Sequence, residues 1–198
     1  MVGPQADARS GLLSDYAVEQ ACADGSDNCI VSITDAIRAE NGGATVTSSQ
    51  GVEVNSLKFF GIREAIATAR EADMVVLALG IDKSQEGEGH DRPNIELPGL
   101  QSEFAEKVLA LRKPTVLVLT NGGPLAIDAL VAGTRSDKMG TAAAPGPAAI
   151  VEAFNPNTNG ATALAQLLFG RENRECQLDY FARTSALHPL TGCITRGH

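Results

Sequence analysis

The feature that most constrains the fold is an uninterrupted apolar run that ends at a glycine and leads into an acidic loop. Residues 74–79 read Met-Val-Val-Leu-Ala-Leu, and Gly80 follows them. No polar residue alternates with the apolar ones, so residues 73–80 are predicted to form a strand that is buried on both faces. The loop 81–98 then lies beyond the carboxyl end of this strand, where open α/β sheets gather their functional residues.

The rest of the chain alternates between strand-like and helix-like segments. Buried strands are predicted over 113–120 and 148–154, and a short strand over 44–47. Segment 124–131 is apolar and fits a strand or a short helix. Helical spacing of apolar residues predicts helices over 33–39, 59–72, 100–111 and 161–169. This alternation predicts an α/β fold, a mostly parallel sheet sandwiched between helices.

Local signals set the expected ends and faces of the helices. Thr34 is the expected N-cap of the first helix, and Asn41 with the two glycines after it is the expected stop. In the helix over 59–72, an apolar face is expected to include Phe60, Ile62 and Ala69.

The chain is predicted to divide into one domain and a tail. Residues 1–170 form the domain, and 134–147 interrupt it as a flexible insertion without periodicity and with many small residues. Residues 171–198 have no clean periodicity and are expected to be a divergent, poorly ordered tail.

Composition excludes several classes of partner. The formal net charge of -8 argues against nucleic-acid binding, which needs clustered Lys and Arg. No apolar run approaches the roughly 20 residues of a membrane span. No signal peptide is visible at the amino terminus.

The four cysteines leave one structural question open. Cys22 and Cys29 flank a turn-rich segment, and they are either joined by a disulfide or are two unlinked thiols. No Cys/His spacing fits a zinc site, so no metal is expected.

The loop after the strand at 73–80 holds the candidate chemistry. Glu86 and Glu88 lie on either side of one glycine, and His90, Asp91 and Arg92 follow. A carboxylic acid serves as a general acid near neutral pH when burial or a second carboxylate raises its pKa. An ion pair between Asp91 and Arg92 would pin the loop. The alternative is a solvated acidic loop with a glycine-rich tip.

A second glycine-rich loop offers another site. Gly122 and Gly123 follow the strand at 113–120, where they would cradle a phosphate or simply form a tight turn. The chain has neither G-x-G-x-x-G nor G-x-x-x-x-G-K-[ST], which favours the turn and makes a nucleotide-binding domain improbable. No cofactor is expected.

Seven motifs in one order give the chain a family resemblance. They are Gly-Pro-Gln-Ala-Asp (3–7) with Leu-Leu-Ser-Asp-Tyr (12–16), Ala-Asp-Met-Val-Val-Leu-Ala-Leu-Gly (72–80), Glu-Gly-Glu-Gly-His-Asp-Arg (86–92), Leu-Pro-Gly-Leu-Gln (97–101), Lys-Pro-Thr-Val-Leu-Val-Leu-Thr-Asn-Gly-Gly-Pro-Leu (113–125), Ala-Ile-Val-Glu-Ala-Phe (149–154) and Ala-Leu-Ala-Gln-Leu-Leu-Phe-Gly (163–170). Together they resemble the carboxy-terminal α/β domain of glycoside hydrolase family 3, the β-glucosidase and β-xylosidase family. The segment around Cys22 and Cys29 looks more like the β-xylosidase branch.

The resemblance implies a retaining, exo-acting β-glycosidase that hydrolyses O-glycosyl bonds. Glu88 matches the position of the general acid/base, with Glu86, His90, Asp91 and Arg92 as substrate-binding or supporting residues. The expected partners are a β-linked oligosaccharide or glycoside and an amino-terminal (β/α)8 barrel that carries the nucleophile. The family also implies secretion.

The chain also departs from the family. The barrel is missing, Met1 falls inside the first strand motif, and residues 134–144 and 171–198 do not match the family pattern. We therefore expect a fragment or a mis-assembled coding sequence, with 171–198 read out of frame, and an isolated chain without activity. The alternative function is a non-catalytic carbohydrate-binding or interaction module.

Overall fold

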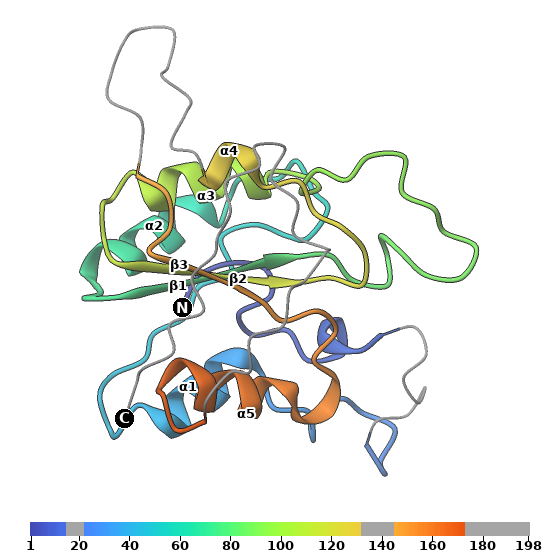
Figure 1. The fold of residues 1–198 in the computed structure, drawn as a ribbon, viewed down its shortest axis with the longest axis horizontal. Helices are drawn as coiled ribbons and strands as arrows, with labels where there is room; N and C mark the ends of the chain where they lie inside the picture. Colours follow the sequence, from blue (N-terminus) through green and yellow to red (C-terminus); the bar gives the residue numbers. More distant parts are fainter. Residues whose placement is uncertain (15–21, 132–144, 173–198) are drawn as a thin grey trace, which may run out of the picture.

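A parallel sheet forms the centre of the molecule in the computed structural model, which describes residues 1–14, 22–131 and 145–172 (Figure 1). Its strands are β1 (Val75–Gly80), β2 (Thr115–Thr120) and β3 (Ala149–Glu152), in the order β1-β2-β3. Both neighbouring pairs are parallel, and Leu77 faces Leu117 in the register of the first. All three strands were predicted, although each predicted range is one to three residues longer than the observed strand at one or both ends.

Helices cover both faces of this sheet (Figure 1). Helices α2 (Ile62–Glu71), α3 (Gln101–Leu109) and α4 (Asp128–Val131) lie on one side. Helices α1 (Ile33–Glu40) and α5 (Asn157–Leu168) pack against each other on the opposite side. One 3-10 turn, η1 (Ser10–Leu12), precedes them in the chain. The predicted α/β sandwich is confirmed.

The strands bury alternate side chains in two separate cores. Leu77, Leu79 and Leu117 belong to the core that contains Phe104 of α3. Ala78 and Val118 belong to the core beneath α1 and α5, with Ile33 and Leu164. Because successive strand residues point to opposite faces, an unbroken apolar run supplies both cores at once.

The amino-terminal residues extend the sheet by one further position. Val2 forms parallel bridges with Leu77 and with Ser49. Its amide donates to Val76 O at 3.0 Å, and the Ala78 amide donates to Val2 O at 2.9 Å. Residues 1–5 therefore end a strand-like segment and enter a turn.

Three local predictions were wrong. Ser32 caps α1, because its side chain accepts from the Asp35 amide, while Thr34 is buried and donates to Ala6 O. No strand forms over 44–47; the nearest sheet contact is the bridge at Ser49. Helix α2 begins only at Ile62, so Phe60 lies outside its apolar face and is 82% exposed.

The structure settles one open prediction, and two predicted segments lie mostly outside the described residues. The ambiguous segment 124–131 contains the short helix α4. The predicted insertion 134–147 lies mostly outside the described residues, and the predicted tail lies outside them from residue 173 onward. Cys176 and Cys193 belong to that tail.

A disulfide joins Cys22 to Cys29 and closes the turn between them. This answers the question that the cysteine spacing left open. Within the described residues, no helix has the length and apolar character needed to cross a membrane.

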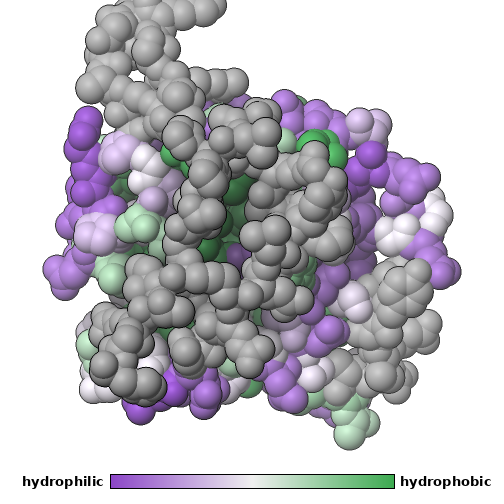
Figure 2. Space-filling model, in the orientation of Figure 1, coloured by the Kyte–Doolittle hydropathy of each residue, from purple (hydrophilic) through white to green (hydrophobic). Residues whose placement is uncertain are grey.

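The described surface is mainly hydrophilic around the outline of the molecule in Figure 2. Large apolar side chains that are exposed among the described residues include three close together before α2, namely Leu57, Phe59 and Phe60. The rings of Phe59 and Phe60 contact each other, with centroids 5.1 Å apart.

Candidate functional site

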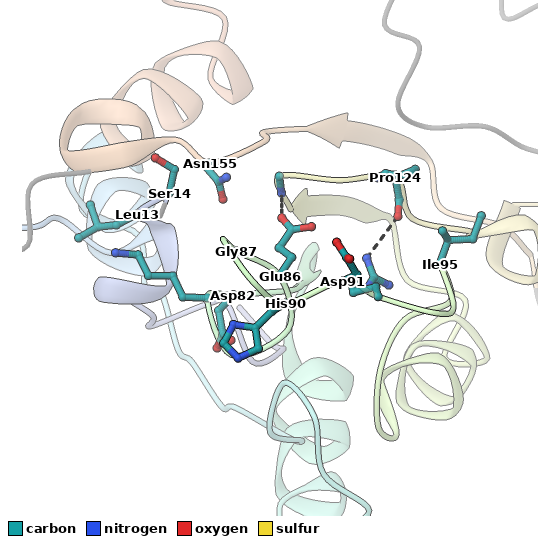
Figure 3. Close-up of a pocket in the computed structure, with 13 residues that line it drawn as sticks. Leu13, Ser14, Asp82, Glu86, Gly87, His90, Asp91, Ile95, Pro124 and Asn155 are labelled. Atoms are coloured by element: carbon teal, nitrogen blue, oxygen red, sulfur yellow. Dashed lines mark hydrogen bonds between the residues drawn. The ribbon is translucent and has the colours of Figure 1, made fainter. Parts of the chain in front are cut away.

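A pocket of about 540 Å³ lies where the loops following β1, β2 and β3 meet (Figure 3). This is the carboxyl edge of the parallel sheet, where the sequence predicted the site. Most of its lining comes from the acidic loop after β1, and the remainder from the segments near residues 13, 122 and 155. The pocket is therefore built from four segments that are distant in sequence.

The acidic loop leaves β1 through a tightly held glycine. Gly80 has φ +148°, and a Cβ at this position would overlap Thr120 O. The fully buried Gln101 side chain brackets it. Its Oε1 accepts from the Gly80 amide at 2.9 Å, and its Nε2 donates to Gly80 O at 2.7 Å and to Val54 O at 2.8 Å. The exit direction of the loop is fixed by these contacts.

A second buried glutamine holds the next residue of the loop. Gln5 Nε2 donates to Ile81 O at 3.2 Å, and the Ile81 amide donates to Thr120 O at 2.9 Å. Gln5 and Gln101 thus secure the end of β1 from two different segments. A buried side-chain amide that replaces missing backbone partners stabilises an irregular chain path.

Asp82 then organises the first turn of the loop. Its carboxylate accepts from the amide and the hydroxyl of Ser84, at 2.9 and 2.5 Å. Its backbone carbonyl accepts from the amides of Gln85 and Glu86, at 2.9 and 3.2 Å. Asp and Ser commonly form such side-chain-to-backbone turns. The turn brings the Glu86 side chain back toward the sheet edge.

Glu86 points into the pocket and contacts the loop after β2 (Figure 3). Its Oε1 accepts a hydrogen bond from the Gly122 amide. The side chain is half-buried, and it lies against Gly122 and Gly123. The glycine pair therefore forms a turn that seats a carboxylate of the same chain.

Glu88 lies on the tip of a tight turn. Gly87 and His90 bridge each other, with the His90 amide donating to Gly87 O at 3.0 Å. Gly89 has φ +78°, which a type II turn requires at its third position. Glu88 occupies the second position and is exposed, and it does not line the pocket. The structure thus separates the two glutamates that the sequence placed together.

His90, Asp91 and Arg92 all line the pocket. Their part in binding substrate or supporting the loop stays a prediction. Arg92 fixes the loop by donating to Pro124 O at 3.3 Å and to Glu96 O at 2.8 Å. The ion pair that was expected between Asp91 and Arg92 is not found among the described ion pairs. The hydrogen bonds of Arg92 to the two backbone carbonyls hold the loop instead. Burial lowers the pKa of Arg92, and the nearby charge of Glu86 opposes that shift.

The loop after β2 is shaped by Asn121, which is fully buried. Its Nδ2 donates to Gly123 O at 2.8 Å, and its amide donates to Phe154 O at 3.0 Å. Of the two roles considered for the glycine pair, the tight turn is the one observed. Asn155, from the loop after β3, completes this side of the pocket.

Sequence reasoning missed the four amides that build the site: Gln5, Gln101, Asn121 and Asn155. Three of them carried a signal, because Gln5, Gln101 and Asn121 are polar residues that interrupt or end motifs of otherwise apolar and turn-forming residues. A buried polar side chain usually makes hydrogen bonds. The side-chain amide nitrogen of each of the three donates to a backbone carbonyl, whereas Gln5 Oε1 and Asn121 Oδ1 accept no hydrogen bond from the described residues.

The described residues suit acid–base chemistry with carboxyl groups. They contain no group of three or more His, Cys, Asp or Glu side chains arranged to hold a metal ion. The carboxyl groups of Asp82, Glu86 and Asp91 line the pocket, and Glu88 is exposed on the turn between Gly87 and His90, which line it too. All four acids lie on a loop whose two ends are held by hydrogen bonds.

Comparison with known proteins identifies similar chains. The model of the glycosyl hydrolase family 3 C-terminal domain matches residues 1–186. Probable beta-D-xylosidase 7 of Arabidopsis thaliana is 33% identical over 174 residues, which is 87% of this chain and 20% of that protein. Beta-D-xylosidase 1 of the same plant is 36% identical over the same coverage.

Solved structures give the same result. A GH3 exo-beta-xylosidase, XlnD, in complex with a xylobiose aziridine probe, has a TM-score of 0.68 and 28% identity. The match covers 86% of this chain and 20% of that one. A β-glucosidase involved in saponin metabolism from intestinal bacteria has a TM-score of 0.71 at 23% identity, which is a likeness of fold. This chain thus spans about a fifth of the length of its first relatives.

Proposed function

Because this chain belongs to the glycosyl hydrolase family 3 C-terminal domain family, we propose that it serves as the second domain of a retaining, exo-acting β-glycosidase. In this role it supplies the general acid/base for hydrolysis of an O-glycosyl bond. The nucleophile is proposed to come from a (β/α)8 barrel domain outside this chain, which spans only about a fifth of the length of its relatives.

Glu88 is the proposed acid/base. It protonates the glycosidic oxygen as the leaving group departs, and it then takes a proton from the water that attacks the glycosyl-enzyme. A retaining mechanism requires its carboxyl group to come within about 5–5.5 Å of the nucleophile. Because that nucleophile belongs to another domain, the acid has to project from this one.

The observation that carries this proposal is the position of Glu88 on an exposed turn at the rim of the pocket. A solvated acidic loop without function would not need the two buried glutamines that hold its start at Gly80 and Ile81. His90 and Asp91 line the pocket beside the turn, where they are proposed to contact substrate hydroxyl groups or to support the loop. Arg92 is proposed to hold the loop through its carbonyl contacts.

The proposed substrate is a β-linked xyloside or glucoside. The names of the relatives favour xylose, since those at 33% and 36% identity are beta-D-xylosidases. No cofactor takes part in this chemistry, because two carboxyl groups and water suffice.

The test is to graft the chain onto a family 3 barrel, in place of the corresponding segment of a β-xylosidase, and to assay p-nitrophenyl β-xyloside and β-glucoside. The graft is expected to turn over substrate, the chain alone is not, and Glu88→Gln is expected to lower kcat by at least about 100-fold. An exposed variant on α2, Glu64→Gln, serves as the matched control. Full activity of the Glu88→Gln graft would contradict the assignment.

A second candidate function is a non-catalytic binding or interaction module. It is favoured by one fact, that the chain spans only about a fifth of its relatives. On this hypothesis, xylo-oligosaccharides would bind the chain alone, and a graft with good folding would show no turnover. Measurable turnover that depends on Glu88 would rule it out.

A further inference from the structure

We propose that the two glutamates of the acidic loop have separate tasks, with Glu86 acting as a positioning residue that locks the turn carrying Glu88. The lock is the seat formed by Gly122 and Gly123 in the loop after β2. This inference rests on the proposed function of Glu88, and it adds a role that the spacing of the two acids does not reveal.

Two features of the seat accommodate the Glu86 carboxylate: the backbone amide of Gly122 donates to it, and neither glycine has a side chain in its way. Glu86 Oε1 accepts from the Gly122 amide. A Cβ on Gly123 would come within 2.8 Å of Glu86 Oε2, and one on Gly122 would collide with Oε1. Neither glycine has φ in the left-handed region, so the backbone itself would tolerate alanine. A methyl group at either glycine would therefore push the Glu86 carboxylate out of its present place, at the cost of its bond to the Gly122 amide.

The buried side chain of Asn121 holds the backbone of the same seat. Asn121 is fully buried, and its Nδ2 bonds to Gly123 O across the turn. On the far side a Cβ on Gly122 would approach Asn155 Nδ2 to 2.8 Å, so the seat is closed on that side too. A carboxylate placed here meets a preformed site.

Glu86 is also fixed at its backbone. Its amide donates to Asp82 O at 3.2 Å, one turn earlier in the loop. Only Gly87 separates it from Glu88, and the turn from Gly87 to His90 closes immediately afterwards. Holding both the amide and the carboxylate of Glu86 thus determines where the following turn projects Glu88.

The carboxylate of Glu86 also interacts electrostatically with Arg92, further along the loop. The guanidinium of Arg92 bonds to Pro124 O in the segment just after the glycine pair. Glu86 and Arg92 therefore attach the loop to the same neighbouring segment, at two points that flank the turn. Two attachments restrict the turn more than either does alone.

The first experiment measures the lock directly in this chain by amide exchange and NMR. The Glu86→Ala variant is expected to shift the Gly122 amide proton and to accelerate its exchange about tenfold, as for the loss of a charge-assisted bond at a partly exposed site. Glu88→Ala and the control Glu64→Gln are expected to leave it unchanged. An unchanged Gly122 amide in Glu86→Ala would overturn the proposal.

The second experiment uses the active graft and the variant Gly122→Ala, which removes no carboxyl group. Glu86→Ala and Gly122→Ala are each expected to lower kcat about 10- to 100-fold, and the double variant is expected to lose no more than either one, because both break the same contact. If the kcat losses of the two single variants multiplied in the double variant, the proposed lock would be overturned.

Azide separates positioning from acid/base chemistry. With a good leaving group, azide attacks the anomeric carbon of the glycosyl-enzyme, displaces the nucleophile carboxylate and needs no general base. Azide is expected to restore turnover by the Glu88→Gln graft and to give glycosyl azide as product. It is expected neither to restore turnover by the Glu86→Ala graft nor to give glycosyl azide with it. Glycosyl azide formed by Glu86→Ala would identify Glu86 as the acid/base and overturn the division of tasks. Failure of Glu88 rescue with an intact Gly122 response would instead contradict only the proposed function.

Discussion

Gln101 is the residue on which the exit of β1 depends most. Its single side chain makes three hydrogen bonds in a fully buried position, two of them to Gly80. Its removal would leave at least three backbone groups without partners, and each orphaned buried group costs about 1–3 kcal/mol. No other described side chain satisfies both the amide and the carbonyl of Gly80.

Gln101→Ala is therefore expected to lower the free energy of unfolding by about 3–5 kcal/mol. Urea denaturation followed by circular dichroism would measure it. Gln50→Ala, at an exposed position, is the matched control and should change stability by less than about 0.5 kcal/mol. A loss of under about 1 kcal/mol for Gln101→Ala would show that water replaces the glutamine.

Two phenylalanines that look alike in sequence behave differently in the structure. Phe104 is fully buried in the core beneath α3, while Phe60 is exposed just before α2. Phe104→Ala is expected to cost about 3–5 kcal/mol through a cavity, and Phe60→Ala less than about 0.5 kcal/mol. Thermal unfolding of both variants under one buffer condition would check this difference. Equal losses would mean that Phe60 is covered in solution.

Among the elements, the three strands were the easiest to predict. A run such as 74–79, short and partly β-branched, favours a strand between two helical layers. Leu77, Ala78 and Leu79 are buried there as expected, whereas Met74, just before the strand, is 61% exposed.

Helix α2 was harder, because Phe59 and Phe60 continue the apolar spacing, whereas Gly61 is the N-cap and the helix begins at Ile62. The cap of α1 was misassigned because Ser32 and Thr34 are both good cap residues, and the Thr34 hydroxyl is engaged by Ala6 O while Ser32 accepts from the Asp35 amide.

The site was predicted only in part. The acidic loop, the sheet edge and four of the residues that line the pocket, Glu86, His90, Asp91 and Arg92, follow from the strand–loop pattern and from the family resemblance. Glu88, the fifth residue named, lies outside the lining. The different positions of Glu86 and Glu88 do not follow from them, because they depend on a turn after β2 that is remote in sequence. Contacts of that kind are set by tertiary packing and leave no periodic signal.

The turn closed by the Cys22–Cys29 disulfide is an element with its own pH dependence. Asp24 within it accepts from the hydroxyl and the amide of Ser26, at 2.7 and 3.0 Å, and these bonds lower the pKa of Asp24. A depressed pKa stabilises the fold above the unfolded-state value and stops doing so as the pH falls through the folded-state value.

The difference in melting temperature between the parent chain and Asp24→Asn is accordingly expected to be small near neutral pH. It should shrink further as the pH is lowered below the ordinary Asp value of 3.8. Differential scanning fluorimetry from pH 2.5 to 7 would follow it. A difference that grows toward acid pH would have the wrong sign for this mechanism.

At the scale of the whole molecule, the disulfide matters more than this turn alone suggests. It lies near the amino-terminal segment, where Arg9 pairs with Asp35 of α1 at 2.6 Å and Ser10 bonds to Asp27 at 3.2 Å. Leu13, a few residues further on, lines the pocket. Cys22 packs in the same core as Leu13 and the buried side chains of α1 and α5, so the bridge lies between the pocket segment and this layer.

Reduction of the disulfide, or the double variant Cys22→Ser with Cys29→Ser, is expected to cost about 2 kcal/mol, the chain-entropy value for a loop whose cysteines are 7 residues apart. Guanidinium unfolding with and without reductant would measure it. The double variant should not respond to reductant, and any response would point to cysteines elsewhere in the chain.

The seat formed by Gly122 and Gly123 has a consequence for how such chains diverge. Positions 86 and 122 are 36 residues apart, yet a side chain at the second would displace the carboxylate of a glutamate at the first from its present place. We therefore expect the two positions to vary together: a lineage that gains a methyl group at 122 loses the contact that the acid at 86 makes with the Gly122 amide. An alignment of relatives that mixes glutamate at 86 freely with larger residues at 122 would show that this coupling does not operate.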